Sequence, residues 1–114
     1  MYNKVKPILE INNTKRGVNY TMGPISIHQF NEFSKYGINA LRLFQYVMTV
    51  RGLKKLRKDE FVKIDNANLY SWFGVHQPKK WTVLNKLHNA GLIELRKQGK
   101  GKAPLVKIIV PTKH

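Results

Sequence analysis

Polar and basic side chains that can bind nucleic acid gather in the stretch QPKKWTVLNK. Gln77 and Asn85 carry amides, which can pair bidentately with adenine. Lys79 and Lys86 can approach guanine or a backbone phosphate, and the hydroxyl of Thr82 can bond several base edges. These five residues are therefore candidate nucleic-acid contacts, although an ordinary solvated helix face has the same composition.

A second basic group surrounds two glycines in the stretch KQGKGKAP. Polar, glycine-rich stretches between strand-like segments are typical of hairpin tips, and glycines let the main chain approach phosphates closely. Each lysine can displace one counterion from nucleic acid. The candidate contacts here are Lys97, Gln98, Lys100 and Lys102. The alternative is a solvated tip whose lysines deter aggregation.

A third basic group, Arg51, Lys54, Lys55 and Arg57, lies earlier in the chain. It has no apolar stripe of the kind that holds a helix on a membrane surface. We expect this group to contact the phosphates that flank a binding site, and the alternative is a charged loop.

The remaining reactive side chains form no catalytic or metal-binding pattern. The chain has no cysteine, and its four histidines are scattered without the spacing of metal ligands. Asp59 and Glu60 are adjacent, but no third carboxylate or histidine is placed to complete a two-metal site. No glycine-rich phosphate loop precedes a helix. We therefore expect a protein that is not an enzyme and has no catalytic residue, metal or cofactor.

The composition indicates a polyanionic partner. Among 114 residues, 21 Lys and Arg stand against 6 Asp and Glu, which gives a formal net charge of +15. Such a chain repels itself unless a polyanion neutralises it, and nucleic acid is favoured over an anionic membrane. The sequence shows no secretory signal and no apolar stretch that could span a membrane. A length of 114 residues fits one domain, and the absence of cysteine suits a reducing compartment. Frequent Lys and Asn are typical of an AT-rich genome, so we expect a protein of the bacterial cytoplasm or nucleoid.

The elements that hold these groups can be predicted from helix caps and hydrophobic spacing. Ser26 and Gln29 fit a capping box at the start of a helix that runs to Gly37. Asn39 can cap the next helix, which Gly52 ends. On that second helix four apolar residues share an inward face: Leu41, Phe44, Val47 and Met48.

The C-terminal part of the sequence predicts a short strand, two helices and a β-hairpin. Asp65 can cap the first of these helices, and Gly74 ends it. Pro78 suits the first turn of the second, because its missing N–H is not needed there. Gly91 ends that helix and leads into the hairpin. The expected strands are 61–64, 92–96 and 105–110, and the expected helices are 66–73 and 78–90.

Residues 1–24 allow two interpretations. The first is a β-hairpin, in which residues 4–11 form an edge strand that contains Pro7 and residues 18–22 return as a second strand. The second is a loose basic arm. The residues do not favour one over the other.

From Asn66 to Val110 the chain resembles the winged-helix branch of the helix-turn-helix superfamily, of the small basic type found in bacterial, plasmid, phage or mobile-element proteins. The residues that carry the resemblance are Gly74 and Val75, a polar turn at His76 and Gln77, Leu84 and Leu87, and the step Gly91, Leu92 and Ile93. The resemblance implies an α+β fold over residues 25–114, with a three-helix core, a small antiparallel β-wing, and the N-terminal arm or hairpin before it. It also implies that the helix at 78–90 lies in the major groove while the wing contacts the backbone or the minor groove. On that helix the residues assigned to the core are Val83, Leu84 and Leu87.

Lys80 and Trp81 fit the resemblance less well. Members of this superfamily usually have an aliphatic residue where this chain has Lys80, so the helix could be rotated slightly, with Trp81 taking the packing role. Trp81 is then a half-buried anchor or, in the alternative, a ring that stacks on a sugar or an unpaired base. Both residues stay among the candidate nucleic-acid contacts.

Three functions fit these features. The first is sequence-preferring binding of duplex DNA, as in a transcriptional regulator or a plasmid or phage partition protein. The second is a replication accessory role in a mobile element, with binding to single-stranded or forked DNA. The third is a winged helix that binds an acidic protein. No helix is expected after the hairpin, so a homodimer would use residues 1–37.

Overall fold

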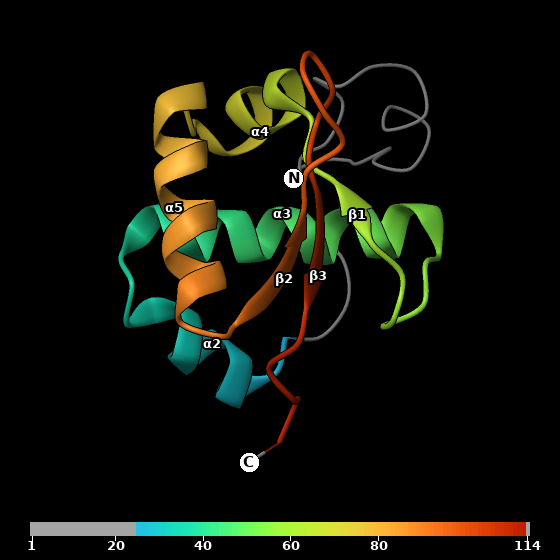
Figure 1. Cartoon of the computed structure of the whole chain (residues 1–114). Coiled ribbons are helices and arrows are strands. Elements are labelled where there is room, and N and C mark those ends of the chain that lie inside the picture. The colour runs from blue at the N-terminus through green and yellow to red at the C-terminus, as the bar shows by residue number, and fades with distance from the viewer. Residues whose placement is uncertain (1–24, 114) are drawn as a thin grey trace, which may run out of the picture.

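The computed structural model describes residues 25–113, and over these the chain is α+β, with four helices and one three-stranded antiparallel sheet (Figure 1). The helices are α2 (Ile27–Ser34), α3 (Ile38–Lys54), α4 (Asn66–Phe73) and α5 (Gln77–Asn89). The strands are β1 (Val62–Lys63), β2 (Ile93–Arg96) and β3 (Leu105–Ile108). This order of elements matches the sequence prediction. The hairpin and the basic arm considered for residues 1–24 lie outside the described residues.

A side-chain cap begins α2 and also ties this helix to the C-terminal segment. The Ser26 hydroxyl accepts a hydrogen bond from the Gln29 N–H at 3.1 Å, as a capping box predicts. The Gln29 side chain does not complete the box, because its Oε1 accepts no hydrogen bond from the described residues, while its Nε2 donates to the Val110 carbonyl at 2.7 Å. The Ser26 hydroxyl in turn donates to the Thr112 carbonyl at 2.6 Å. Two side chains at the start of α2 therefore hold the segment that follows β3.

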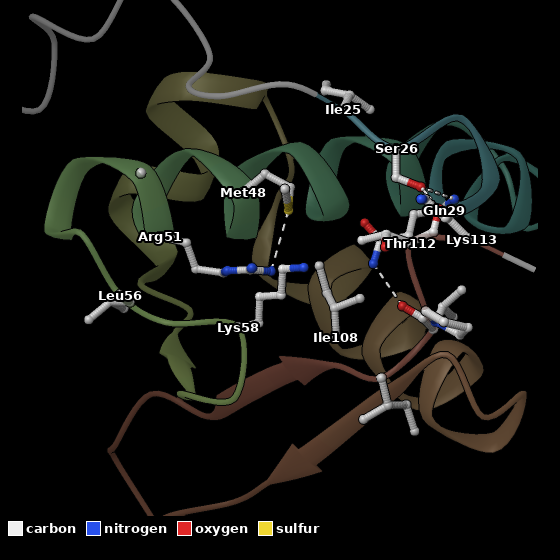
Figure 2. Close-up of a pocket in the computed structure, with 14 residues that line it drawn as sticks. Ile25, Ser26, Gln29, Met48, Arg51, Leu56, Lys58, Ile108, Thr112 and Lys113 are labelled. Carbon is white, nitrogen blue, oxygen red and sulfur yellow. Dashed lines mark hydrogen bonds between the residues drawn. The ribbon is translucent and has the colours of Figure 1, made fainter.

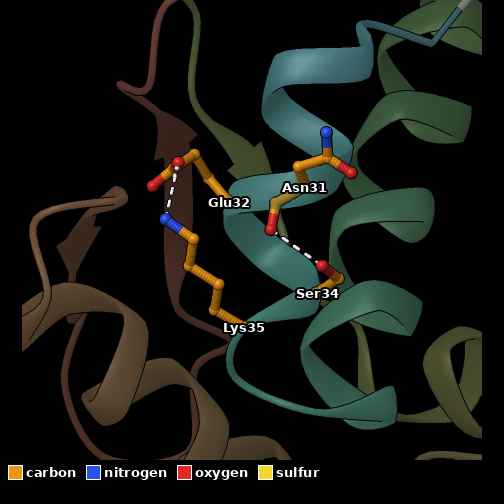
Figure 3. Close-up of polar contacts among 4 residues, drawn as sticks. All are labelled: Asn31, Glu32, Ser34 and Lys35. Carbon is orange, nitrogen blue, oxygen red and sulfur yellow. Dashed lines mark hydrogen bonds and ion pairs between the residues drawn. The ribbon is translucent and has the colours of Figure 1, made fainter.

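The end of α2 is closed by contacts within its last turn (Figure 3). Ser34 Oγ donates to the Asn31 carbonyl at 2.7 Å, and the Lys35 ammonium pairs with the Glu32 carboxylate at 2.9 Å. The helix ends at Ser34, before the predicted end at Gly37. A serine hydroxyl that bonds to a carbonyl one turn back competes with the backbone N–H groups that would extend the helix.

Both ends of α3 differ from the sequence prediction. Gly37 precedes the helix at φ 101°, and Asn39 lies inside the first turn, so Asn39 is not the cap. Glycine reaches positive φ without strain, which lets the chain turn into α3 directly after Gly37. At the other end the helix passes Gly52 and ends at Lys54, followed by Lys55 in the left-handed region at φ 56°. Gly52 stays helical because the packing of α3 outweighs its low helix propensity.

The hydrophobic core forms around α3, which contacts α2, α4, α5 and β1 (Figure 1). Phe44 of α3 stacks on Phe33 of α2 with ring centroids 4.7 Å apart, and Tyr46 packs against Trp72 of α4 at 5.3 Å. Burial raises the pKa of Tyr46 to about 12, because the phenolate would lose its hydration. Of the four residues predicted to face inward, Phe44 and Val47 are buried. The other two, Leu41 and Met48, are half-buried.

The central strand of the sheet is β3, with β1 on one side and β2 on the other. Both neighbours run antiparallel to it, and the register pairs Val62 with Val106 and Ile93 with Ile108. Strand β1 has only two residues, and it pairs with the part of β3 that is nearest the hairpin tip. The predicted hairpin of β2 and β3 is present, with strands slightly shorter than expected.

A tight turn separates α4 from α5, as the glycine and proline residues predict. The Asp65 carboxylate accepts from the Asn68 N–H at 2.9 Å and caps α4, and Gly74 ends this helix at φ 74°. Val75 is buried in the turn, and Pro78 lies in the first turn of α5. Figure 1 shows α5 running in a different direction from α4. The inner face of α5 is buried at the predicted residues, Val83, Leu84 and Leu87.

Candidate nucleic-acid interface

The outer face of α5 carries the polar residues predicted to read base edges. Four of them are exposed: Gln77, Lys79, Asn85 and Lys86. Thr82 is exposed too, and its hydroxyl donates to the Pro78 carbonyl at 3.1 Å, which leaves the oxygen lone pairs as acceptors. His76 precedes the helix without a side-chain hydrogen bond to its first turn. The first N–H groups of α5 therefore have no side-chain cap at His76, and a phosphate can bind such groups.

Lys80 does not lie on this outer face, since only 2% of the residue is exposed. Its ammonium donates a hydrogen bond to the side-chain oxygen of Asn66 at the start of α4. Burial lowers the pKa of Lys80, and the negative charge of Asp65 opposes part of that shift. The structure thus corrects the placement of Lys80 among the surface contacts. Its aliphatic stem fills a packing position, and its ammonium group bonds to Asn66 of α4.

Trp81 is half-buried against the core. The ammonium groups of Lys80 and Lys97 lie 5.0 Å and 5.6 Å from the centre of its ring, within the range of cation–π contacts. This arrangement agrees with an anchor that joins α5 to the hairpin. Part of Trp81 also lines a groove at the hairpin tip, so the residue is accessible from the candidate interface.

The groove lies between the hairpin tip and the first turn of α5 and has a volume of about 730 Å³. Gln77 and Trp81 line it from α5. In the tip, Gly99 and Gly101 adopt φ values of 112° and 79°, which favour glycine. The polar residues predicted for the tip are all exposed, namely Lys97, Gln98, Lys100 and Lys102. The last three of these line the groove, so the structure brings the tip and α5 together.

Two further residues line this groove that the sequence did not single out. Lys63 is exposed on β1, and Asn66 is the first residue of α4. Lys63 pairs with Leu105 of β3, which places it close to the hairpin tip. Alternation along residues 61–64 indicated that Lys63 points outward. Only the pairing of β1 with β3 shows which surface it joins.

Two residues of the early basic group are engaged elsewhere. Arg51 is half-buried and lines a separate cavity beside α2. Arg57 is exposed but lies 3.6 Å from the Asp59 carboxylate and 3.4 Å from the Glu60 carboxylate. Exposed ion pairs contribute little to stability, but these two carboxylates offset the charge of Arg57. Neither arginine lines the groove.

The two lysines of the early basic group remain exposed where α3 ends. Lys54 and Lys63 line a common hollow of about 270 Å³. Lys63 also lines the groove. The exposed basic surface therefore continues from the hairpin tip past Lys63 to Lys54, with Lys55 next to it in the chain.

Of the five carboxylates in residues 25–113, only that of Asp65 lines the groove, and none belongs to α5 or to the hairpin tip. The five belong to Glu32, Asp59, Glu60, Asp65 and Glu94. Most have structural partners: Asp65 caps α4, for example, and the Glu94 carboxylate lies 3.5 Å from the Lys107 ammonium. Because neither α5 nor the tip contains an acidic residue, the potential over this surface is positive.

No family model, no curated protein and no solved structure matches this chain. Within residues 25–113, no three side chains of metal-binding type lie together. No helix in this part of the chain is long and apolar enough to cross a bilayer.

Proposed function

We propose that this chain is a winged-helix protein that binds duplex DNA with sequence preference, as a transcriptional regulator or a partition-type protein does. In this proposal α5 enters the major groove and the hairpin tip contacts the backbone. The observation that carries it is the groove between these two elements. Three exposed lysines, Lys63, Lys100 and Lys102, line the groove, and the buried Lys80 lies in its wall. The one carboxylate there is that of Asp65, which already caps α4. A helix fits the width of a major groove, and lysines beside it neutralise phosphates.

The side chains divide by the kind of contact they would make. Gln77, Thr82 and Asn85 are neutral, and on α5 they would read base edges. The exposed lysines of α5, of the hairpin tip, of β1 and at the end of α3 would neutralise phosphates and set the position of the protein without reading sequence. They are Lys54, Lys55, Lys63, Lys79, Lys86, Lys97, Lys100 and Lys102.

One feature favours a second function, the binding of single-stranded or forked DNA by a replication accessory protein. Trp81 lines the groove beside the hairpin tip. An accessible indole ring can stack on an unpaired base of any sequence. Duplex DNA remains the primary proposal because the outer face of α5 is polar and free of carboxylates.

Titrations of a Lys100→Ala/Lys102→Ala variant with DNA across a salt series test the proposal. Removing two phosphate contacts should weaken binding to all duplexes alike and reduce the salt slope by up to about two units. The matched control is Lys35→Ala/Lys113→Ala, which removes the same charge from α2 and the C-terminal segment.

The control variant should keep the wild-type slope and nearly the wild-type affinity. Equal losses in both variants would show that net charge acts without a defined interface. Absence of binding by the wild type to duplex and single-stranded DNA at low salt would reject the proposed function. Tighter binding to single strands than to duplex would select the second function.

A further inference from the structure

A second cavity lies apart from the groove at the hairpin tip. It has a volume of about 820 Å³ and lies between the start of α2, the C-terminal half of α3 and the end of β3 (Figure 2). It shares no lining residue with the groove. Its volume is within the range of roughly 300–1,000 Å³ that is typical of small-molecule sites.

The lining of this cavity is largely apolar and carries positive charge. Met48 comes from α3, Leu56 from the loop after it, and Ile108 from β3 (Figure 2). Three cationic residues also line the cavity, and no acidic residue does. The cations are Arg51, Lys58 and Lys113. An apolar cavity with this charge is complementary to an anion that has an apolar body.

Two polar atoms at the cavity have no hydrogen-bond partner among the described residues. Gln29 is only 4% exposed, and while its Nε2 bonds to the Val110 carbonyl, its Oε1 is buried and unpaired. The Nε of Arg51 is also buried and unpaired, and its Nη1 lies 3.5 Å from the sulfur of Met48, a weak acceptor. Buried polar groups normally have partners, so these atoms indicate a ligand that brings both an acceptor and a donor.

Burial without a carboxylate partner is unfavourable for a guanidinium. It lowers the pKa of Arg51, because the charged form loses water. Figure 2 shows the Lys58 side chain extending toward the same region as that of Arg51, which adds a second positive charge. An anion placed between Arg51 and Lys58 would offset the repulsion between their positive charges and accept a hydrogen bond from the unpaired Nε of Arg51.

We propose that this cavity binds a small organic acid with an apolar body and, next to its carboxylate, a hydroxyl or amide donor. The carboxylate accepts hydrogen bonds from Arg51 and Lys58. The donor bonds to Gln29 Oε1, and the apolar body packs against Met48 and Ile108. This site does not depend on the proposed DNA binding, because it uses none of the groove residues.

Charge complementarity favours a small acid over other occupants. A second copy of this chain would bring a molecule of net charge +15 to a cationic cavity. Residues 1–24 carry four Lys and Arg against one Glu, so they too are cationic. Like charges brought together without counterions oppose association.

The test is an amide-resolved NMR titration of the full chain with three related probes. 3-Phenyllactate has a ring, a carboxylate and a hydroxyl, 3-phenylpropionate lacks the hydroxyl, and methyl 3-phenyllactate lacks the charge. We expect saturable shifts around Arg51 and Ile109 at about millimolar concentration or below. Affinity should fall in the order phenyllactate, phenylpropionate, methyl ester.

Three variants test the contacts. Arg51→Met keeps an unbranched apolar stem but should weaken phenyllactate binding by about tenfold or more, because the charged hydrogen bonds are lost. Arg42→Met removes an exposed charge from the same helix and should leave binding unchanged. Gly52→Leu should fill part of the cavity and block binding. Because leucine forms helices better than glycine, this substitution should not weaken α3 itself. Thermal melts of all variants show whether each is folded.

Three results would overturn the proposal. The first is the absence of saturable shifts with all three probes. The second is equal binding by the wild type and a folded Arg51→Met variant, or equal losses in Arg51→Met and Arg42→Met. The third is the appearance, in the free protein, of nuclear Overhauser contacts from residues 1–24 to Ile108 and Ile109, which would show that the chain itself fills the cavity.

Discussion

In the proposed function, Asn85 would distinguish base reading from backbone binding, because its amide is exposed on α5 and uncharged. Asn85→Ala should reduce the preference for a selected duplex over random duplex by about 1–3 kcal/mol, since a bidentate contact with a base is lost. Affinity for random duplex should stay almost unchanged. Competition titrations with both duplexes measure the two quantities, and an unaltered preference would remove Asn85 from the base-reading set.

Lys80 is a buried cation with a neutral partner, and this gives stability a pH dependence of definite sign. Burial lowers the pKa of Lys80 below its ordinary value of 10.5, which the unfolded chain keeps. Between the folded and unfolded pKa values the unfolded state binds more protons, so stability rises with pH in that window. Lys80→Met keeps the apolar stem and removes the charge. It should stabilise the protein by about 1 kcal/mol at neutral pH.

Urea unfolding at neutral and alkaline pH measures this difference. The advantage of Lys80→Met should shrink as pH rises toward 10.5, because the wild-type ammonium then loses its proton. Lys79→Met is the matched control, since Lys79 is the exposed neighbour and should show no such trend. A difference that is constant with pH would show that Lys80 is not desolvated in the folded protein.

Predictions for single residues succeeded where neighbours in the sequence decide the outcome. The cap at Asp65, the left-handed Gly74 and the first-turn Pro78 are all confirmed. They depend on backbone geometry within a few residues. The resemblance marks the position of Lys80 as one that is usually aliphatic, but the polar run around it favours exposure, and its partner Asn66 lies on another helix, so its burial was not predicted.

At the scale of elements, the order of helices and strands followed from caps and hydrophobic spacing, whereas the ends of α3 did not. Gly52 is a local stop signal that the packing of α3 overrides. The left-handed turn then falls on Lys55, a residue with a side chain, and not on a glycine. Local propensity cannot show this, because contacts with other elements determine where α3 ends.

The left-handed conformation of Lys55 can be tested directly. Lys55→Gly should stabilise the protein by about 1 kcal/mol, because a residue with a Cβ is strained at φ 56° and glycine is not. Lys55→Ala removes the same charge but keeps the Cβ, so it should give no such gain. Chemical denaturation of the three proteins measures the difference. Equal stability of the glycine and alanine variants would mean that the turn carries no strain.

At the scale of the whole molecule, neither the groove nor the cavity could be predicted from the sequence. Lys63 joins the hairpin tip only because β1 pairs with β3, a contact between distant parts of the chain. Arg51 was grouped with its basic neighbours, yet its position on α3 places it beside Gln29 and Ile108 in the cavity. Composition correctly indicates positive charge, but tertiary packing decides which charges share a surface.

The excess of positive charge should make stability depend on salt. The exposed lysines of α5 and the tip have no carboxylate on those segments, and the net charge of the chain is +15. Screening reduces their mutual repulsion. If added salt stabilises the fold by about 1 kcal/mol, the Tm should rise by roughly 4–8 °C. Melts in chloride at increasing ionic strength measure this, and a falling Tm would contradict it.

The position of β3 in the sheet has a consequence for the newly made chain. Protein synthesis proceeds from the N-terminus, so Val62 and Lys63 leave the ribosome well before Leu105 and Val106. Until those later residues emerge, β1 has no strand with which to pair, and Lys63 and the tip lysines do not share a surface. The complete groove therefore forms only after the residues of β3 have left the ribosome, and a nascent chain that stops short of Leu105 lacks it.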